Sequence, residues 1–585
     1  MARASPRRSD GRRDVTGARR GATDTFEETL DLYGAFPRLS DYQVRALEQH
    51  GERVHTAPGE VLFREGDDYS CFWVVLEGKV ATYSDYGSDE EMQIAVHGAG
   101  RFLGELGVLT GQAAFLTAVA CEPAELLRVP VDELRKLVTQ DPVLGDLVLR
   151  AYLARRSILL EVGAGLRIVG SCFSPDTRRL REFAARNRLP HRWIDLEEDQ
   201  EAEALLNALG VSPQETPVVI WRGSVLRNPS NAELARVIGL PSKVPQWADC
   251  DLLVVGTGPA GLAASVYGAS EGLRTMTFDA IATGGQAGTS PRIENYLGFP
   301  TGISGSELAE RATLQAEKFG AHLHLAAEAV GLEYRDGHHV VLFDDGSAVS
   351  GHALLIASGA RYRKLHVARL DEFEGHSVHY AATHVEAHTC IGDPVVVVGG
   401  GNSAGQSSLF LARHASLVHL LIRHEDLGRD MSRYLVNEIE RDPQIHVMRC
   451  TEVRELVGEH GVLNAVVAQN TRTGERWRLA ARALFVFIGA RPHTQWLGDQ
   501  IALDDHAFVL TGPAAANASN GGWDTGREAL PLETSRPGVF AAGDVRAGSV
   551  KRLASAVGEG SMAVRLVHEH LEKSAHWQIH AAVNA

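Results

Sequence analysis

Two glycine-rich turns have the spacing needed to hold the pyrophosphate of a dinucleotide. GTGPAG occupies residues 256–261 and GGGNSA occupies residues 399–404. Each turn follows an apolar run that predicts a strand and precedes a run that predicts a helix. The first glycine allows the tight turn, the second lets backbone N–H groups approach a phosphate, and a small third residue allows close helix–strand packing. Since a helix N-terminus adds positive potential, the sequence predicts two dinucleotide sites.

The first turn belongs to a complete strand–turn–helix–strand unit. The segment DLLVVGTGPAGLAASVYGASEGLRTMTFD ends at Asp279. A carboxylate about twenty residues beyond the glycines can accept hydrogen bonds from ribose hydroxyls. The residues that we expect to contact this dinucleotide are Gly256, Gly258, Pro259, Ala260, Gly261 and Asp279.

The second turn differs at the position that distinguishes NAD from NADP. An acid would bind the ribose of NAD at the end of the following strand, but Arg423 and His424 stand there. A guanidinium suits the doubly charged 2′-phosphate of NADP, although an exposed arginine at a strand end is the simpler interpretation and NADH stays possible. The residues that we expect at this site are Gly399, Gly401, Asn402, Ser403, Ala404, Arg423 and His424.

A third motif lies near the C-terminus. The segment VFAAGD predicts a strand that ends in Gly543 and Asp544 before a helix begins. An acid at this place can bind the ribityl hydroxyls of a flavin. The two dinucleotide units and this strand together predict a two-cofactor flavoprotein, in which the first unit holds FAD and the second, inserted unit holds the nicotinamide nucleotide.

These motifs resemble one known family. GGQAGTSPRIENYLGFP (284–300), SGARYRKL (358–365), GGGNSAGQ and VFAAGDV together look like the low-molecular-weight thioredoxin reductases, over about 250–575. The resemblance implies a homodimer whose NADP domain rotates to exchange nicotinamide for a disulfide at the flavin. It also implies which further residues line FAD and its isoalloxazine end: Gly285, Gln286 and Asn295, with Lys551 and Arg552 at the ring.

The chain departs from that family at its redox centre. Thioredoxin reductases place a CATC-type pair after a tyrosine, whereas here Tyr380 is followed by Ala381, Ala382, Thr383 and His384. A disulfide relay needs one thiolate to attack and a second to resolve, and alanine does neither. Two candidate catalytic residues stay open, each beside a simpler interpretation. His384 could donate a proton or make a polar contact, and Cys390 could form a mixed disulfide or be a buried core cysteine.

The composition excludes several classes of function. The 585 residues carry a formal net charge of −16, which argues against general nucleic-acid binding. Six scattered cysteines include no CxxC, so neither a zinc site nor a local dithiol is expected. No apolar run reaches the roughly 20 residues that cross a bilayer, and we therefore expect a cytoplasmic protein. Residues 1–25 are expected to be a disordered basic tail.

The N-terminal part predicts two further domains. Residues 26–162 read as a β-roll with helices and resemble the cyclic nucleotide-binding domains, with Glu105 at the place of the ribose-binding acid. Phe115 and Leu116 replace the arginine that should meet the cyclic phosphate, so a structural, dimerising or altered-ligand role is expected. Residues 166–241 resemble a glutaredoxin or thioredoxin fold in which Thr216-Pro217 matches the cis-proline step, but no CxxC is present.

The predicted fold is therefore a multidomain α/β protein, with a β-roll and helices, a small thioredoxin-like domain and two Rossmann-like domains. The FAD-binding domain would comprise 249–365 and 491–575, and the NADP-binding domain 366–490 would be inserted in it. The predicted function is an NADPH-dependent FAD oxidoreductase that passes electrons to a small molecule or small redox protein without a local CxxC. Two alternatives stay open: a redox- or nucleotide-sensing regulator, and a disulfide reductase that uses Cys390 or an external thiol.

Overall fold

The computed structural model describes residues 26–583 except 32, 68–70, 89, 106–112, 200–201, 223, 243, 246–248, 291, 375, 381, 383, 460 and 519–526. The basic tail predicted at 1–25 lies outside the described residues. Contacts divide the chain into two compact units. The first comprises Met1–Leu166, Pro190–Arg192 and Trp221–Gly223, and the second comprises Arg167–Leu189, Trp193–Ile220 and Ser224–Ala585.

The first unit contains the β-roll that the alternating sequence pattern predicts. Its two four-stranded sheets have the orders β1-β8-β3-β6 and β2-β7-β4-β5. Phe72 and Phe102 are fully buried and pack against Val148 of the long helix α4. The strands are β1 Glu52–Thr56, β2 Val61–Phe63, β3 Cys71–Glu77, β4 Val80–Ser84, β5 Met92–His97, β6 Phe102–Leu103, β7 Thr117–Ala120 and β8 Ala124–Pro130. The helices are α1 Asp41–Glu48, α3 Val131–Gln140 and α4 Pro142–Val162.

The helical stretch after the β-roll is interrupted at Asp141. The side chain of Asp141 accepts hydrogen bonds from the backbone N–H groups of Val143 and Leu144, at 2.9 and 3.1 Å. Pro142 occupies the first turn of α4, where a missing N–H is tolerated. The cap and the proline therefore end one helix and begin the next.

A small α/β segment follows. Its four strands lie in the order β10-β9-β11-β12, and β9 pairs antiparallel with β11. The Thr216–Pro217 bond before β11 is cis, as the sequence predicts. The elements are β9 Leu166–Val169, α5 Pro175–Arg186, β10 His191–Ile194, α6 Ala202–Ala208, η1 Pro213–Glu215, β11 Val218–Trp221, β12 Ser224–Arg227 and α7 Asn231–Val237.

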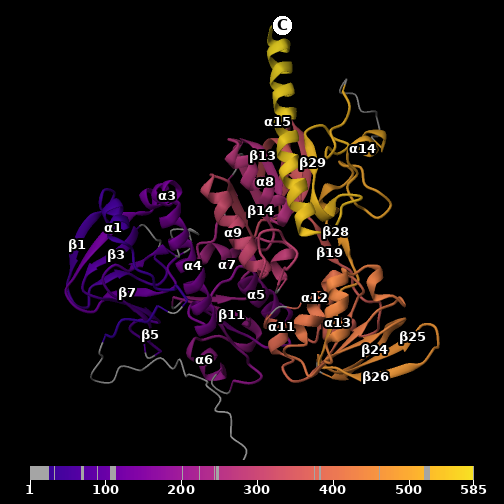
Figure 1. The fold of residues 1–585 in the computed structure, drawn as a ribbon, viewed down its shortest axis with the longest axis horizontal. Helices are drawn as coiled ribbons and strands as arrows, with labels where there is room; N and C mark the ends of the chain where they lie inside the picture. The colour runs from indigo at the N-terminus through magenta and orange to yellow at the C-terminus, as the bar shows by residue number, and fades with distance from the viewer. Residues whose placement is uncertain are drawn as a thin grey trace, which may run out of the picture. The chain divides into compact units, whose positions relative to one another are not determined.

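A seven-stranded sheet carries the first glycine turn. Its order is β15-β14-β13-β18-β17-β16, and the C-terminal strand β29 pairs parallel with β18. Helix α8 packs against α15 beside this sheet (Figure 1). The strands are β13 Asp249–Val255, β14 Thr275–Asp279, β15 His322–Leu325, β16 Ala329–Arg335, β17 His338–Phe343, β18 Ala348–Ile356 and β29 Val539–Ala541. The helices are α8 Pro259–Ser270, η2 Ala287–Thr289, α9 Gly305–Lys318, η4 Gln495–Leu497, α14 Pro513–Ala518, η5 Gly543–Val545 and α15 Leu553–Val583.

A second parallel sheet, with the order β20-β27-β21-β22-β23, carries the second glycine turn. It is inserted between β18 and β29, and the ribbon of β19 Ala360–Tyr362 with β28 Ala490–Pro492 joins the two parts of the chain. Its strands are β20 Val378–His379, β21 Pro394–Val398, β22 Leu417–Leu421, β23 Ile445–Met448 and β27 Ala483–Val486. Its helices are α10 Leu370–Phe373, α11 His384–His388, α12 Asn402–Leu411, η3 Leu427–Arg429 and α13 Arg433–Arg441. A three-stranded sheet completes it with β24 Thr451–Glu459, β25 Val462–Asn470 and β26 Arg476–Ala480.

Among the helices that the structure describes, none has both the length and the apolar character needed to cross a membrane.

Candidate dinucleotide and flavin sites

The first glycine turn, between β13 and α8, leaves room for a ligand only at its middle glycine. A Cβ on Gly256, whose φ is +105°, would lie 2.3 Å from the carbonyl oxygen of Ala357. A Cβ on Gly261 would lie 1.8 Å from the carbonyl oxygen of Gly256. Gly258 has open space instead, because its Cβ would meet no atom within 4 Å. The outer glycines are therefore required by the chain itself, and the middle one faces the space that a pyrophosphate needs.

The second turn, between β21 and α12, repeats this arrangement. Gly399 has a φ of +146°, and its Cβ would lie 2.3 Å from the carbonyl oxygen of Phe487. The nearest atom to a Cβ on Gly401 is the carbonyl oxygen of Asp430, at 3.9 Å. Ala404 is fully buried, so a methyl group fits at the third position. Both turns therefore have a tight outer position and an open middle position.

Each turn opens the N-terminus of a helix to this space. Gly258 is the N-cap of α8 and Gly401 is the N-cap of α12, and neither helix start has a side-chain cap. The first N–H groups of a helix have no partner within it, and the helix dipole favours an anion beside them. Pro259 removes one of these donors from α8 at little cost. Both helix starts thus fit the phosphates of a dinucleotide.

Two predicted residues beside the second turn have different surroundings. The side chain of Asn402 accepts a hydrogen bond from the backbone N–H of Ser432 at 2.7 Å, which ties the turn to the start of α13. Ser403 is exposed at the start of α12. Ser403 is therefore accessible to a phosphate, whereas Asn402 holds the loop around one.

Asp279, at the end of β14, lies at the first turn, where its carboxylate is already engaged by protein donors. One oxygen accepts from the N–H and the hydroxyl of Thr257, at 2.9 and 2.7 Å. The other accepts from the N–H groups of Ile281 and Ala282, at 2.9 and 3.1 Å. Asp279 therefore fixes the glycine turn and the following loop, and a ribose hydroxyl would share these oxygens.

The loop after β14 folds over the first turn. The N–H of Gly284 donates to the carbonyl of Thr257 at 2.8 Å, and a Cβ on Gly285 would lie 2.9 Å from the Cα of Gly258. The side chain of Gln286 donates to the carbonyl oxygen of Ala360. This loop brings Gly285 and Gln286 beside the turn, and their contact with FAD stays a prediction. Asn295, from the same motif, is exposed.

The third motif places a partly buried acid after β29. The N–H of Gly543, whose φ is +76°, donates at 2.7 Å to Glu559 on α15. Burial raises the pKa of the Asp544 carboxyl above its usual value, and the nearby Lys551 offsets only part of this rise. The Lys551 ammonium lies 3.4 Å from the backbone carbonyl oxygen of Asp544. Asp544 and Lys551 are therefore neighbours, and Arg552 lies exposed next to them in the chain.

The predicted NADP-selecting residues lie in the loop that follows β22, which carries two arginines and three acidic residues. The Nε of Arg423 lies 3.0 Å from Nε2 of His424, and a guanidinium nitrogen of Arg429 lies 3.1 Å from Nδ1 of the same ring. Arg423 is exposed, and Arg429 keeps 59% of its side-chain surface exposed. Arg429 is not among the residues predicted from the sequence, although its position as a second arginine in the same loop was the available signal. The loop offers two guanidiniums for a phosphate rather than one.

The two predicted catalytic residues lie on or just after α11. The side chain of His384 is outside the described residues, as is Ala381. Cys390 is fully buried, and its thiol donates to the carbonyl oxygens of Glu386 and Ala387, both at 3.5 Å. Burial and the nearby Asp393 and Glu386 raise the pKa of the Cys390 thiol to about 11. This is the environment of a core cysteine, because a nucleophilic cysteine needs an accessible thiolate.

Two protein-family models match this chain. The model described as "Pyridine nucleotide-disulphide oxidoreductase" matches residues 250–560, and the model described as "Cyclic nucleotide-binding domain" matches residues 53–141. The first match contains both glycine turns and the Asp544 motif, and the second contains most of the β-roll.

Thioredoxin reductases are among the proteins and solved structures that are similar to the C-terminal part of this chain. A thioredoxin reductase of Treponema pallidum is 33% identical over 324 residues, which cover 55% of this chain and 98% of that protein. The NADPH-dependent thioredoxin reductase 3 of Arabidopsis thaliana is 31% identical over 327 residues, but the match spans only 58% of its length. The crystal structure of Lactococcus lactis thioredoxin reductase superposes with a TM-score of 0.50 at 25% identity, over 55% of this chain and 99% of that one. The chain belongs to the pyridine nucleotide-disulphide oxidoreductase family.

Proposed function

We propose that this chain is an NADPH-dependent FAD oxidoreductase of the thioredoxin reductase type whose electrons leave without a local cysteine pair. The observation that carries the proposal is the contrast between two open dinucleotide turns and the sequence Tyr380-Ala381-Ala382-Thr383-His384. Bound FAD would supply the redox chemistry by taking a hydride from NADPH and releasing electrons to the acceptor. The chain's own residues then bind and orient the two cofactors.

The two cofactors are assigned to the two turns. We assign FAD to the turn at Gly258 because the Asp544 strand β29 belongs to the same sheet. We assign NADPH to the turn at Gly401 because Arg423 and Arg429 lie in the loop after the next strand. The FAD-binding domain is then formed by 249–365 and 491–575, and the NADPH-binding domain by 366–490.

A disulfide route has little support from the cysteines. None of the six forms a disulfide, and two thiols are needed to attack and to resolve one. Cys172, in the thioredoxin-like segment that we propose for 166–241, has a pKa that burial and Asp195 raise to about 12. We therefore propose a quinone, oxygen or a small redox protein as the acceptor. By resemblance we also propose a homodimer. Because the cysteines form no disulfide, we propose that the protein is cytoplasmic.

An anaerobic titration tests this function. NADPH is expected to bleach the flavin of the purified protein, and turnover is expected with a quinone such as menadione but not with a disulfide such as 5,5′-dithiobis(2-nitrobenzoic acid). The Cys390→Ser variant is expected to keep the quinone turnover within about twofold, because a buried thiol that binds backbone carbonyls takes no part in transfer.

Other results would contradict these expectations in different ways. A flavin that NADPH does not bleach would favour the regulatory alternative over catalysis. Rapid turnover of the disulfide that is lost in Cys390→Ser would show that the buried thiol becomes accessible, and the proposed acceptor class would be wrong.

The two arginines of the loop after β22, Arg423 and Arg429, are expected to set the preference for NADPH. In the double variant Arg423→Gln/Arg429→Gln, the KM for NADPH should rise at least about 100-fold while the KM for NADH stays unchanged, since charge-assisted hydrogen bonds are worth about 1.5–3 kcal/mol each. Steady-state kinetics with both nucleotides measure this. Arg449→Gln is the matched control, because Arg449 is exposed in the same part of the chain and pairs with Glu440 at 3.3 Å. Equal changes in the KM for NADPH and for NADH would show that the two arginines do not bind the 2′-phosphate.

A further inference from the structure

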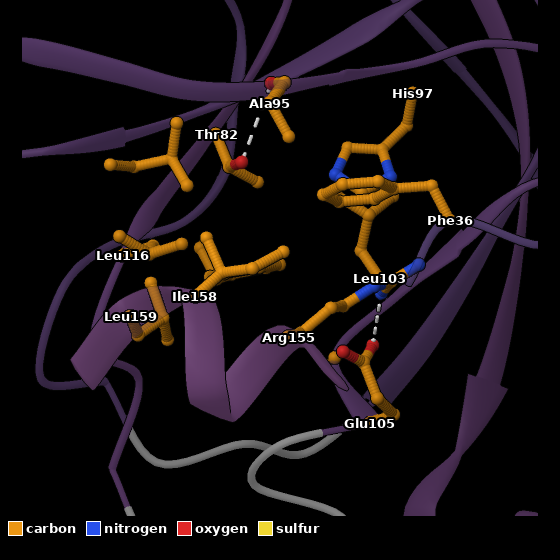
Figure 2. A pocket seen from close by; sticks show the side chains of 13 residues that line it. Phe36, Thr82, Ala95, His97, Leu103, Glu105, Leu116, Arg155, Ile158 and Leu159 are labelled. Carbon is orange, nitrogen blue, oxygen red and sulfur yellow. Dashed lines mark hydrogen bonds and ion pairs between the residues drawn. The ribbon is translucent and has the colours of Figure 1, made fainter. Parts of the chain in front are cut away.

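A cavity of about 40 Å³ lies inside the β-roll, between its strands and helix α4 (Figure 2). Its wall is largely apolar and includes Phe36, Phe63, Ile94, Leu116, Ile158 and Leu159. In Figure 2, Leu116, Ile158 and Leu159 lie together on one side, and Arg155, Glu105 and His97 lie on the other. The cavity therefore has an apolar side and a polar side.

The acid of the polar side is already paired within the chain. Arg155 of α4 lies 2.7 Å from the Glu105 carboxylate, and only 8% and 2% of these two side chains are exposed. The same guanidinium donates to the backbone carbonyls of Ala35 and Phe102, at 2.7 and 3.0 Å. Glu105 was the residue expected to bind a ribose hydroxyl, and its Oε2 instead lies in an ion pair with Arg155.

Among the described residues, three buried polar atoms of this side have no hydrogen-bond partner: Nδ1 of His97, Oε2 of Glu105 and Nη2 of Arg155. The Glu105 oxygen lies in the ion pair with Arg155, which leaves Nδ1 and Nη2 as the two atoms still to be satisfied. His97 is only 2% exposed, and its ring lies edge-on to Phe36 at a centroid distance of 5.5 Å. Burial, together with Arg155 and Arg101, lowers the pKa of His97 well below its usual value, so the imidazole is neutral. Because buried polar atoms without partners are unfavourable, these two atoms point to a ligand or to water.

A cyclic nucleotide does not fit this cavity. The positions of the expected phosphate arginine hold Phe115 and Leu116, which are 3% and 7% exposed. The guanidinium that lines the cavity is neutralised by Glu105, so the described residues of its wall offer a phosphate no unpaired cation. A volume of about 40 Å³ has room for roughly three water-sized groups, far fewer than a purine ribotide contains.

We infer that this cavity binds a compact, uncharged molecule with an apolar body and one hydroxyl group, and that it rejects cyclic nucleotides. A hydroxyl both donates and accepts, so it can accept from Arg155 Nη2 and serve either tautomer of the neutral His97. The apolar body packs against Leu116, Ile158 and Leu159. An ionised ligand would lose its hydration without gaining an unpaired countercharge.

Saturation-transfer NMR on the full chain tests this inference with 2-propanol as the probe. The wild-type protein is expected to give a signal that saturates with concentration. Leu116→Phe and Ile158→Phe fill the cavity from a loop and from α4, and each should abolish the saturable signal. His97→Phe should raise the dissociation constant about 2–10-fold by removing one hydrogen bond. Val143→Phe, at a position of α4 that is 70% exposed, is the matched control and should bind as the wild type does.

Each outcome decides the inference. Saturable binding that both filling variants lose, while their circular dichroism spectra match that of the wild type, supports it. A signal that does not saturate, or that persists in both filled variants, means that the cavity holds only water and overturns the inference. Micromolar binding of cAMP or cGMP by calorimetry, with displacement of 2-propanol, would overturn it as well.

Discussion

Gly258→Val is expected to yield a folded protein without FAD. Gly258 has a φ of −64°, which valine adopts, and its Cβ would meet no atom within 4 Å. The branched side chain would instead fill the space before the first N–H groups of α8, where a pyrophosphate must approach. We expect the affinity for FAD to fall at least about 100-fold, equal to about 2.7 kcal/mol.

Flavin absorbance after purification and after incubation with excess FAD measures this effect. Valine is a poor N-cap and costs the helix about 1 kcal/mol, so circular dichroism must show a retained fold. Gly256→Val provides the contrast, because a φ of +105° and a backbone oxygen 2.3 Å from the added Cβ should disrupt the turn itself. Stoichiometric FAD in a folded Gly258→Val protein would show that the first turn does not hold the pyrophosphate.

The sequence predicted both dinucleotide turns because local rules determine them. An apolar strand, a glycine at a positive φ and a helix that starts without a side-chain cap follow one another within a short segment. The structure has these elements at Gly256 and again at Gly399. The insertion of one parallel sheet between β18 and β29 also follows from the order of the motifs along the chain.

The partners of single side chains could not be predicted from the sequence, because they depend on contacts between distant segments. Arg155 belongs to a residue type that is mostly exposed, yet it is buried in α4 and pairs with Glu105. Asp279 reads as a ribose ligand, but its oxygens also hold Thr257 and the following loop. No periodicity encodes such pairs, and only the packed sheets and helices bring them together.

Two sites of this chain lack residues that the family resemblances lead one to expect. The β-roll has Phe115 and Leu116 where a phosphate arginine is expected, and the redox segment has Ala381 and His384 where cysteines are expected. The glycine turns, by contrast, keep a tight outer position and an open middle position. This combination is the reason why we propose a flavoprotein whose electrons leave without a local cysteine pair.

Gly401→Val is expected to keep FAD but to lose reduction by NADPH. Gly401 has a φ of −98°, and its Cβ would have the carbonyl oxygen of Asp430 as its nearest neighbour, at 3.9 Å. Valine therefore fits the turn and blocks the N-terminus of α12, as the same change blocks α8 at Gly258. At a limiting NADPH concentration, the rate of flavin bleaching in anaerobic stopped-flow should fall at least about 100-fold.

The two valine variants control each other, because each turn should govern a different property. Gly258→Val should lose the flavin altogether, whereas Gly401→Val should stay yellow and be bleached by dithionite as fast as the wild type. A normal dithionite reaction locates the defect in nucleotide binding rather than in the flavin. If NADPH bleached Gly401→Val at the wild-type rate, the second turn would not bind the nucleotide. The cationic residues Arg423 and Arg429 would then need another role.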